Sequence, residues 1–145
     1  MSEGHVQTNL IGSRSKHYEF EIEKGAIRAF ARAVGDDNPL YHDENYAKEQ
    51  GYASLVAPPT FPITFSIPLP GFDKELSRTL HGGQEFQYER PIAAGDVLRC
   101  YCKLVDVSEK DGKQGGKMTF YHYETRGEDQ QGTLVFTSKT TVIYR

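Results

Sequence analysis

The sequence predicts an α+β domain in which a curved antiparallel sheet wraps a single long helix. Three observations predict this class: an alternating stretch comes first, an amphipathic stretch follows it, and four long alternating stretches occupy residues 80–145. With 145 residues, the chain is long enough for one core, because a domain of this size buries about 68–70% of its unfolded surface. We therefore predict one domain over residues 15–145, after a flexible lead-in over residues 1–14.

The spacing of apolar residues predicts the first two elements. Residues 17–22, HYEFEI, alternate between apolar and polar side chains and predict a strand. Residues 25–34 carry one apolar stripe at helical spacing, and Gly35 is suited to end this helix. The stripe consists of Ile27, Phe30, Ala31 and Val34. It predicts a helix with one face against the core.

The rest of the chain divides into a short helix, a proline-rich segment and strands. Asp43 suits the N-cap of a helix that Gly51 would end. Residues 55–70 are apolar but contain five prolines, which predicts a structured wall or lid without a regular strand or an uninterrupted helix. The later stretches predict an antiparallel meander. Two sets of side chains alternate on one face there: Leu98, Cys100, Cys102 and Leu104, and Leu134, Phe136, Val142 and Tyr144.

Composition and charge argue against several classes of protein. The net charge is −3 and the basic residues are scattered, which argues against binding to a nucleic-acid backbone. No apolar run is long enough to span a membrane, and the N-terminus lacks the pattern of a signal peptide. Cys100 and Cys102 would share one face of a strand, so we expect buried, reduced thiols and a cytoplasmic protein. The five histidines form no ligand pattern, so we expect no metal.

Residues 34–47, VGDDNPLYHDENYA, are the strongest candidate for chemistry. Local structure alone explains much of this loop, because Asn38-Pro39 turns a chain and Asp36 or Asp37 can accept hydrogen bonds from nearby backbone. A functional interpretation is also open: a carboxylate beside His42 or Tyr41 could move a proton on and off a substrate. Histidine, with a pKa of about 6.5, is the better base, and tyrosine, with a pKa of about 10, is the better donor.

Three separated motifs resemble one known family. The runs are FARAVGDDNPLYHDENYAKEQGYASLVAPPTF, LHGGQEFQYERPIAAGD and GKMTFYHYET. They are similar to the MaoC-like hydratases and dehydratases, in particular to the branch called FAS1-like dehydratase, or MaoC N-terminal.

The resemblance implies a hot-dog fold, in which a long central helix is wrapped by an antiparallel sheet. It also implies a homodimer, or a heterodimer with a related hot-dog subunit. The substrates would be thioesters of coenzyme A or acyl carrier protein, and the reaction would add water reversibly to a trans-2-enoyl group to give the 3-hydroxyacyl form. No cofactor is implied beyond the carrier that is part of the substrate.

The family's hydratase motif, Asp-x-Asn-Pro-x-His-x-Asp, fits the loop incompletely. Asp36 takes the position of the acid that activates water, and Asn38, which we assign to substrate binding, also matches. Tyr41 stands where the family has its histidine, and His42 is one residue too late. The resemblance therefore makes Asp36, Tyr41 and His42 the candidate catalytic residues. The tyrosine is similar to that of branch members thought to bind the acyl chain while a partner subunit supplies the chemistry.

A second departure concerns the donor for the thioester carbonyl. The hydratases place a His-Gly pair at the start of the central helix, and the glycine N–H polarises this carbonyl. Pro58-Pro59 stands at that place here, and proline has no N–H to donate. The N–H of Thr60 could compensate if a helix begins there. His81, before two glycines that predict a turn or, less favoured, a bulge, is a further candidate for substrate binding.

Three functions follow from these observations. The leading hypothesis is a hydratase or dehydratase of acyl thioesters, active alone as a homodimer or as one subunit of a heterodimer. The alternative is a non-catalytic subunit that binds the acyl thioester for a partner hydratase. A hot-dog thioesterase is the third, and it fits the motifs least.

Overall fold

The computed structural model describes residues 8–145, and within them a five-stranded antiparallel sheet dominates the molecule. The strands lie in the order β1-β3-β4-β5-β2, so β1 and β2 form the two edges. Their bounds are β1 Tyr18–Glu21, β2 Thr79–Tyr88, β3 Val97–Asp111, β4 Lys117–Glu128 and β5 Leu134–Tyr144. The two α-helices are α1 Lys24–Ala33 and α2 Glu44–Glu49. Short 3-10 turns are η1 Thr8–Leu10, η2 Pro39–Tyr41, η3 Phe61–Thr64 and η4 Leu76–Arg78.

Helix α1 forms where its apolar stripe predicts, but the stripe is one residue shorter than expected. Ile27 and Ala31 are fully buried, and Phe30 packs edge-on against Phe61 with ring centroids 5.7 Å apart. Val34 is 54% exposed, because the helix ends at Ala33 and Val34 is only its C-cap. Gly35 follows with φ of 74°, a conformation that ends helices and that glycine adopts without strain.

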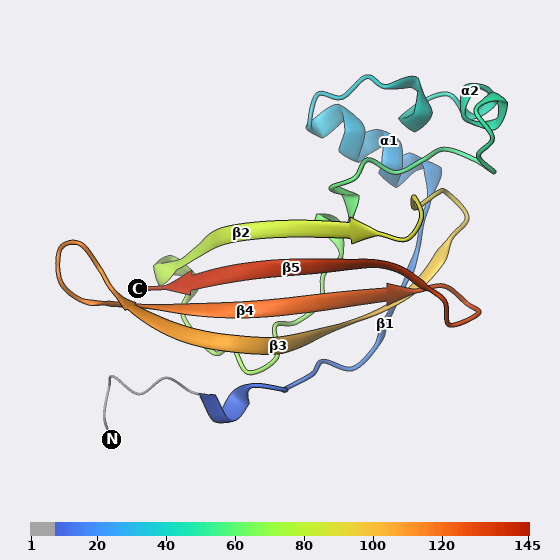
Figure 1. Cartoon of the computed structure of the whole chain (residues 1–145). Coiled ribbons are helices and arrows are strands. Elements are labelled where there is room, and N and C mark those ends of the chain that lie inside the picture. Colours follow the sequence, from blue (N-terminus) through green and yellow to red (C-terminus); the bar gives the residue numbers. More distant parts are fainter. Residues whose placement is uncertain (1–7) are drawn as a thin grey trace.

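No long central helix lies along the sheet within residues 8–145, which corrects that part of the prediction. Figure 1 shows α1 and α2 gathered beside one end of the sheet. The inner face of the sheet is covered instead by residues 57–72, which we call the proline-rich segment. Each proline lacks an N–H and disfavours helix in the residue before it, so only the four-residue turn η3 forms there. The predicted structured wall over residues 55–70 is thereby confirmed.

Aromatic contacts hold the proline-rich segment against the sheet. Phe65 stacks on Phe20 of β1, with ring centroids 4.4 Å apart, and meets Phe136 of β5 at 6.0 Å. Farther along, Phe72 packs edge-on against Tyr121, and the Tyr123 hydroxyl donates a 3.2 Å hydrogen bond to a backbone carbonyl of the segment. The segment therefore contacts β1, β4 and β5, and its closure against the sheet depends on side chains far apart in the sequence.

The start of the domain lies earlier than predicted. The Gly12 N–H donates to the Leu104 carbonyl at 2.8 Å, and the Leu104 N–H donates to the Ser13 carbonyl at 2.9 Å. Ser15 extends this pairing to Cys102 of the same strand. Residues 12–15 are therefore bound to β3, which differs from the flexible lead-in predicted for residues 1–14. Residues 1–7 lie outside the described part of the chain.

The predicted alternation in the last strands decides which side chains face inward. All four members of the β3 set, Leu98, Cys100, Cys102 and Leu104, are at most 2% exposed. On β5 the inward positions include Phe136 and Val142, which are also buried. Ser138 and Thr140 fall between these two positions on the same face of the strand. The inner face of β5 is therefore apolar near both ends and polar in the middle.

The two cysteines are free and buried, as the sequence predicts. Burial raises the pKa of the Cys100 thiol to about 12. The folded thiol thus keeps its proton at pH values where the unfolded thiol, with an ordinary pKa of about 8.5, has lost it. The contribution of this group to stability is therefore complete below about pH 8.5 and is lost as the pH rises toward about 12.

This linkage predicts a difference between two alkaline pH profiles. The free energy of unfolding should fall more steeply with rising pH for the natural protein than for Cys100→Ala, which lacks the thiol. Urea unfolding at a series of alkaline pH values measures both profiles. The variant will be less stable throughout because of the cavity it creates, so the slopes are compared and not the absolute values. Parallel profiles would contradict the prediction.

Candidate functional site

The loop between α1 and α2 is built from short-range hydrogen bonds. Asp36 Oδ1 accepts the Asn38 N–H at 3.1 Å, and Asn38 Oδ1 accepts the Leu40 N–H at 3.0 Å, which caps η2. Asp43 Oδ1 accepts the Tyr46 N–H at 3.1 Å and caps α2, as predicted. Much of the motif therefore serves local turns. Asp36 is nevertheless exposed, and its second carboxylate oxygen makes no hydrogen bond within residues 8–145.

Tyr41 turns away from this loop and into the core. It is 7% exposed and belongs to the apolar cluster beneath α1. Burial, and to a smaller extent the negative charge of Asp36, raise the pKa of its phenol above the ordinary value. The hydroxyl therefore stays protonated at neutral pH, so Tyr41 is suited to donate a hydrogen bond and unsuited to act as a base.

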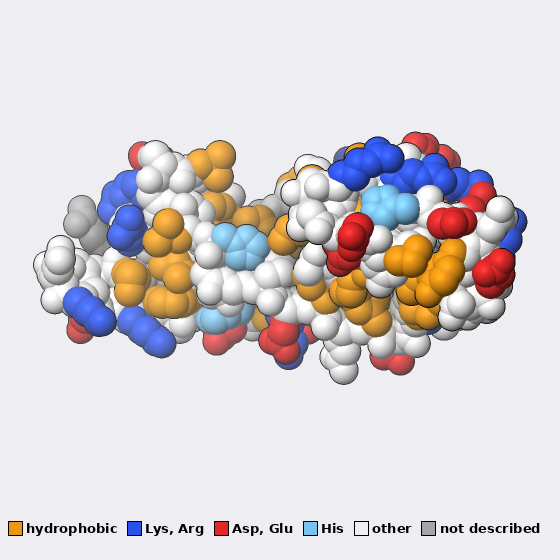
Figure 2. Space-filling model, turned by 90° about the horizontal axis from the view of Figure 1, so that it is seen from above, with side chains coloured by type: hydrophobic (Ala, Val, Ile, Leu, Met, Phe, Trp, Pro, Cys, Tyr) orange, Lys and Arg blue, Asp and Glu red, His pale blue; other side chains and the backbone are white. Residues whose placement is uncertain are grey.

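His42 lies on the same side of the loop as Asp36. Its Nε2 is 3.0 Å from the Asp36 carbonyl oxygen, and because a carbonyl only accepts, Nε2 carries the proton of this hydrogen bond. The two residues line one shallow pocket together with Arg32 and Asp43. Figure 2 shows acidic and basic side chains around a histidine at the helical end of the molecule. The imidazole thus reaches the pocket of Asp36 although it is out of register with the family motif.

Pro59 lies at a second, more apolar cavity of about 320 Å³ that Tyr41 also lines. The Pro59 carbonyl accepts a hydrogen bond from the Tyr88 hydroxyl, and burial raises the pKa of that phenol. Thr60 directly precedes η3, which is only four residues long, so no extended helix begins at its N–H. The Thr60 N–H, which was expected to replace the glycine N–H as donor to the thioester carbonyl, therefore lacks the support of a helix dipole.

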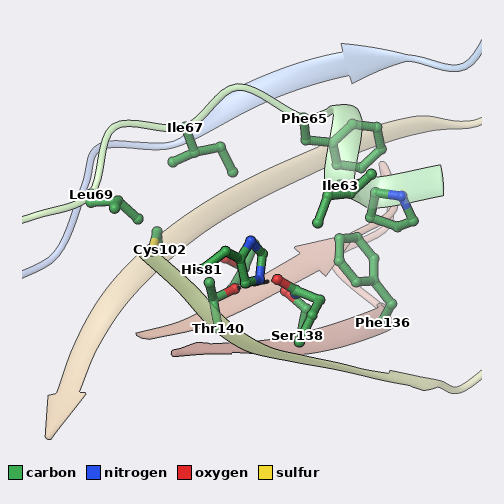
Figure 3. Close-up of a pocket in the computed structure, with 12 residues that line it drawn as sticks. Ile63, Phe65, Ile67, Leu69, His81, Cys102, Phe136, Ser138 and Thr140 are labelled. Carbon is green, nitrogen blue, oxygen red and sulfur yellow. Dashed lines mark hydrogen bonds between the residues drawn. The ribbon is translucent and has the colours of Figure 1, made fainter. Parts of the chain in front are cut away.

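His81 lies in a third place. It belongs to β2, at a bulge between residues 81 and 83, and its Nε2 is 3.0 Å from the Gly83 carbonyl oxygen. The turn favoured for this position is therefore wrong, because the strand continues through the two glycines. His81 lines a cavity of about 220 Å³ between the proline-rich segment and the sheet (Figure 3).

Five of the seven predicted site residues thus fall into three groups and not one, whereas Asn38 and Thr60 line none of these three pockets. Asp36 and His42 share the loop pocket, Tyr41 and Pro59 share the second cavity, and His81 borders the third. Within residues 8–145 there is no group of three or more His, Cys, Asp and Glu side chains arranged to hold a metal ion. None of the helices in that range is long and apolar enough to cross a membrane.

Sequence reasoning missed four polar residues that line the third cavity: Gln84, Thr125, Ser138 and Thr140. The available signal for Ser138 was its place in the alternation of β5, where an inward position is occupied by a hydroxyl. Gln84 gave no such signal, because the bulge at His81/Gly83 shifts the register of β2. The sequence does not predict which side chains of a strand face inward after a bulge.

Comparison with known families decides what kind of protein carries these features. The model of the family described as "FAS1-like, dehydratase domain region" matches residues 9–138. The chain belongs to this family. This match confirms the resemblance of its motifs to the FAS1-like dehydratase branch.

A relative of this FAS1-like dehydratase domain is the UPF0336 protein of Thermobifida fusca (strain YX). It is 40% identical over 133 residues, which cover 87% of this chain and 84% of the relative. Its name assigns no reaction.

Solved structures confirm the hot-dog fold. The C-terminally truncated HadBC (3R-hydroxyacyl-ACP dehydratase) complex of Mycobacterium tuberculosis has a TM-score of 0.75 at 24% identity and covers 94% of this chain and 98% of its own. The R-hydratase PhaJ1 of Pseudomonas aeruginosa has a TM-score of 0.65 at 21% identity, covering 92% of this chain and 81% of its own. The FAS1-like dehydratase domain described above is thus a hot-dog domain whose inner face is covered by a proline-rich segment.

Proposed function

We propose that this protein takes part in the reversible hydration of trans-2-enoyl thioesters, with coenzyme A or acyl carrier protein as the carrier. In this proposal it is one subunit of a hot-dog dimer, and it binds the acyl thioester while a related subunit supplies the chemistry. Membership of the FAS1-like dehydratase family and the retained Asp36-x-Asn38-Pro39 loop support the reaction class. The dehydratase named in the HadBC structure is itself a complex.

The burial of Tyr41 is the main observation in favour of a binding role for this chain and a catalytic role for the partner subunit. A base must be deprotonated to accept a proton, and a phenol that burial keeps protonated at neutral pH does not meet this requirement. The oxyanion position is also altered, because Pro59 has no N–H and its carbonyl already accepts a hydrogen bond from Tyr88. Loss of one such donor costs about 10²–10³ in rate in other acyl-transfer enzymes. Both departures weaken catalysis by the chain alone.

A second candidate function is a stand-alone hydratase in which Asp36 and His42 act together. The observation that favours it is their shared pocket and the contact between the imidazole and the Asp36 carbonyl. In that case Nδ1 of His42 would be the base, because Nε2 donates to the Asp36 carbonyl, and the free oxygen of Asp36 would hold the water.

An enoyl-thioester assay separates the two functions. The purified chain, given trans-2-enoyl-CoA of several lengths, should show no loss of the conjugated thioester absorbance above background, yet it should bind saturated acyl-CoA in calorimetry. Activity should appear on mixing with a hot-dog subunit that carries an intact Asp-x-Asn-Pro-x-His motif. In the mixture, Asp36→Asn in this chain should change the rate by no more than about twofold, since a group outside the chemistry contributes little.

The controls decide between the outcomes. The partner subunit alone gives the baseline for the mixture. Turnover by the purified chain that is lost in both Asp36→Asn and His42→Ala would overturn the binding role and establish the stand-alone enzyme. Release of free thiol would point to a thioesterase. Absence of both turnover and acyl-CoA binding would overturn the proposed function itself.

A further inference from the structure

The cavity between the proline-rich segment and the sheet has two chemically different walls. The segment contributes an apolar wall that includes Phe65, Ile67 and Leu69, while the opposite wall, from β2 and β5, carries His81, Ser138 and Thr140 (Figure 3). At about 220 Å³ the cavity far exceeds the roughly 10–15 Å³ that one water needs. An alkyl chain alone would be matched by apolar walls on both sides.

Ser138 is the residue that this arrangement leaves unexplained. It is only 6% exposed, and its hydroxyl makes no hydrogen bond to any of residues 8–145. Buried hydroxyls normally find a partner, because an unsatisfied one has lost water without replacement. The hydroxyl lines the cavity, so its missing partner must come from whatever occupies that space.

Neighbouring groups define the chemistry of that partner. Thr140 Oγ1 donates to the amide oxygen of Gln84 at 3.0 Å, so the Gln84 NH₂ group remains available as a donor. If the oxygen and nitrogen of the Gln84 amide were exchanged, its NH₂ group would donate to Thr140 Oγ1, and the Thr140 hydroxyl would be free to donate instead. A donor therefore remains in either orientation. None of the twelve lining residues is Asp, Glu, Lys or Arg, and the Nε2 of His81 already contacts the Gly83 carbonyl oxygen. The wall is therefore suited to a neutral oxygen atom and not to a carboxylate or an ammonium group.

We infer that this cavity binds the end of the acyl chain distant from the thioester, that this end carries a neutral oxygen substituent, a hydroxyl or a carbonyl, and that Ser138 donates a hydrogen bond to it. The inference rests on the proposed function and adds a specificity to it. The apolar wall contacts the hydrocarbon, and the donors on β2 and β5 select the oxygen. Among the lining residues Ile63 and His81 are exposed, whereas Ser138 and Phe136 are buried.

Calorimetry with matched acyl-CoA probes tests the inference on the full chain. Hexanoyl-, octanoyl- and decanoyl-CoA are each compared with their terminally hydroxylated and penultimate-oxo counterparts, which share the carrier and the length. At least one oxygenated probe should bind the natural protein about 3–10-fold more tightly than its plain counterpart, the range expected for one neutral hydrogen bond. Whether the hydroxyl or the oxo series shows this preference identifies the substituent.

Two variants test whether the preference for oxygenated probes depends on Ser138. Ser138→Ala should reduce the preference to less than about twofold while retaining affinity for the plain chains, because only the donor is removed. Its melting temperature without ligand should rise or stay unchanged, since the unsatisfied hydroxyl is gone. Ser66 is an exposed serine of the proline-rich segment that does not line the cavity, so Ser66→Ala should keep the preference.

Two kinds of negative result distinguish failure of the oxygen selection from failure of acyl binding. Equal binding of plain and oxygenated probes by the natural protein, or a preference that persists in Ser138→Ala, would overturn the oxygen selection and leave acyl binding intact. No binding of any probe would overturn both this inference and the proposed function.

Discussion

Phe136→Ala is expected to lower the free energy of unfolding by about 3–5 kcal/mol, the range for removing a buried phenyl ring. Phe136 is 0% exposed and lies where the sheet meets the proline-rich segment. Its ring is 6.0 Å from that of Phe65 and 6.1 Å from that of Tyr88. Loss of the ring therefore removes contacts that hold both the segment and the edge strand β2.

Phe120→Ala is the matched control for this prediction. Phe120 lies on β4, is only partly buried, and has the Lys110 ammonium 5.1 Å from its ring centroid. Its loss should cost about 1 kcal/mol, the order of an exposed cation–π contact with modest burial. Urea unfolding followed by circular dichroism measures both variants. Equal losses in the two variants would contradict the central place we assign to Phe136.

Gly127→Ala is the second large effect we expect, with a loss of about 1–3 kcal/mol from overpacking. Gly127 lies on β4 directly opposite Phe136 of β5, and the phenyl ring covers its backbone. An added Cβ would lie within 3.0 Å of three atoms of that fully buried ring, so the ring would have to shift from its packed position. The glycine is needed here for close approach and not for its backbone conformation.

A control and a double mutant make this prediction specific. Gly25→Ala in α1, where an added Cβ would meet nothing within 4 Å, should stabilise the protein by about 0.4–1 kcal/mol. If the ring is the cause, Gly127→Ala should cost less than about 0.5 kcal/mol in a Phe136→Ala background, and the double-mutant cycle then reports the coupling. Additive losses would show that the ring is not what excludes the side chain.

Local patterns predict the parts of this fold whose stability is local. The helical stripe and Gly35 place α1 to within one residue, and Asp43 caps α2 as expected. The inward face of β3 follows from strict alternation alone. Each of these features depends on residues within a few positions of one another, so the sequence is sufficient to predict it.

The candidate site was predicted less completely. The loop from Asp36 to Asp43 was found because its motif is contiguous, but the direction of Tyr41 and the position of His42 beside Asp36 depend on how α1 packs. Ser138 was not recognised as a site residue, since its importance arises from a cavity whose other wall is more than sixty residues away in the sequence.

The sequence by itself determined the α+β class, the strands, the positions of the two helices and the family, because repeated spacing and contiguous motifs carry that information. Only the tertiary structure decided that a proline-rich segment, and not a long helix, covers the inner face, and that Tyr41 is buried. Prolines exclude a helix but do not say where the freed chain will lie. That position results from the packing of Phe65 against Phe20 and Phe136, which brings together three regions of the chain.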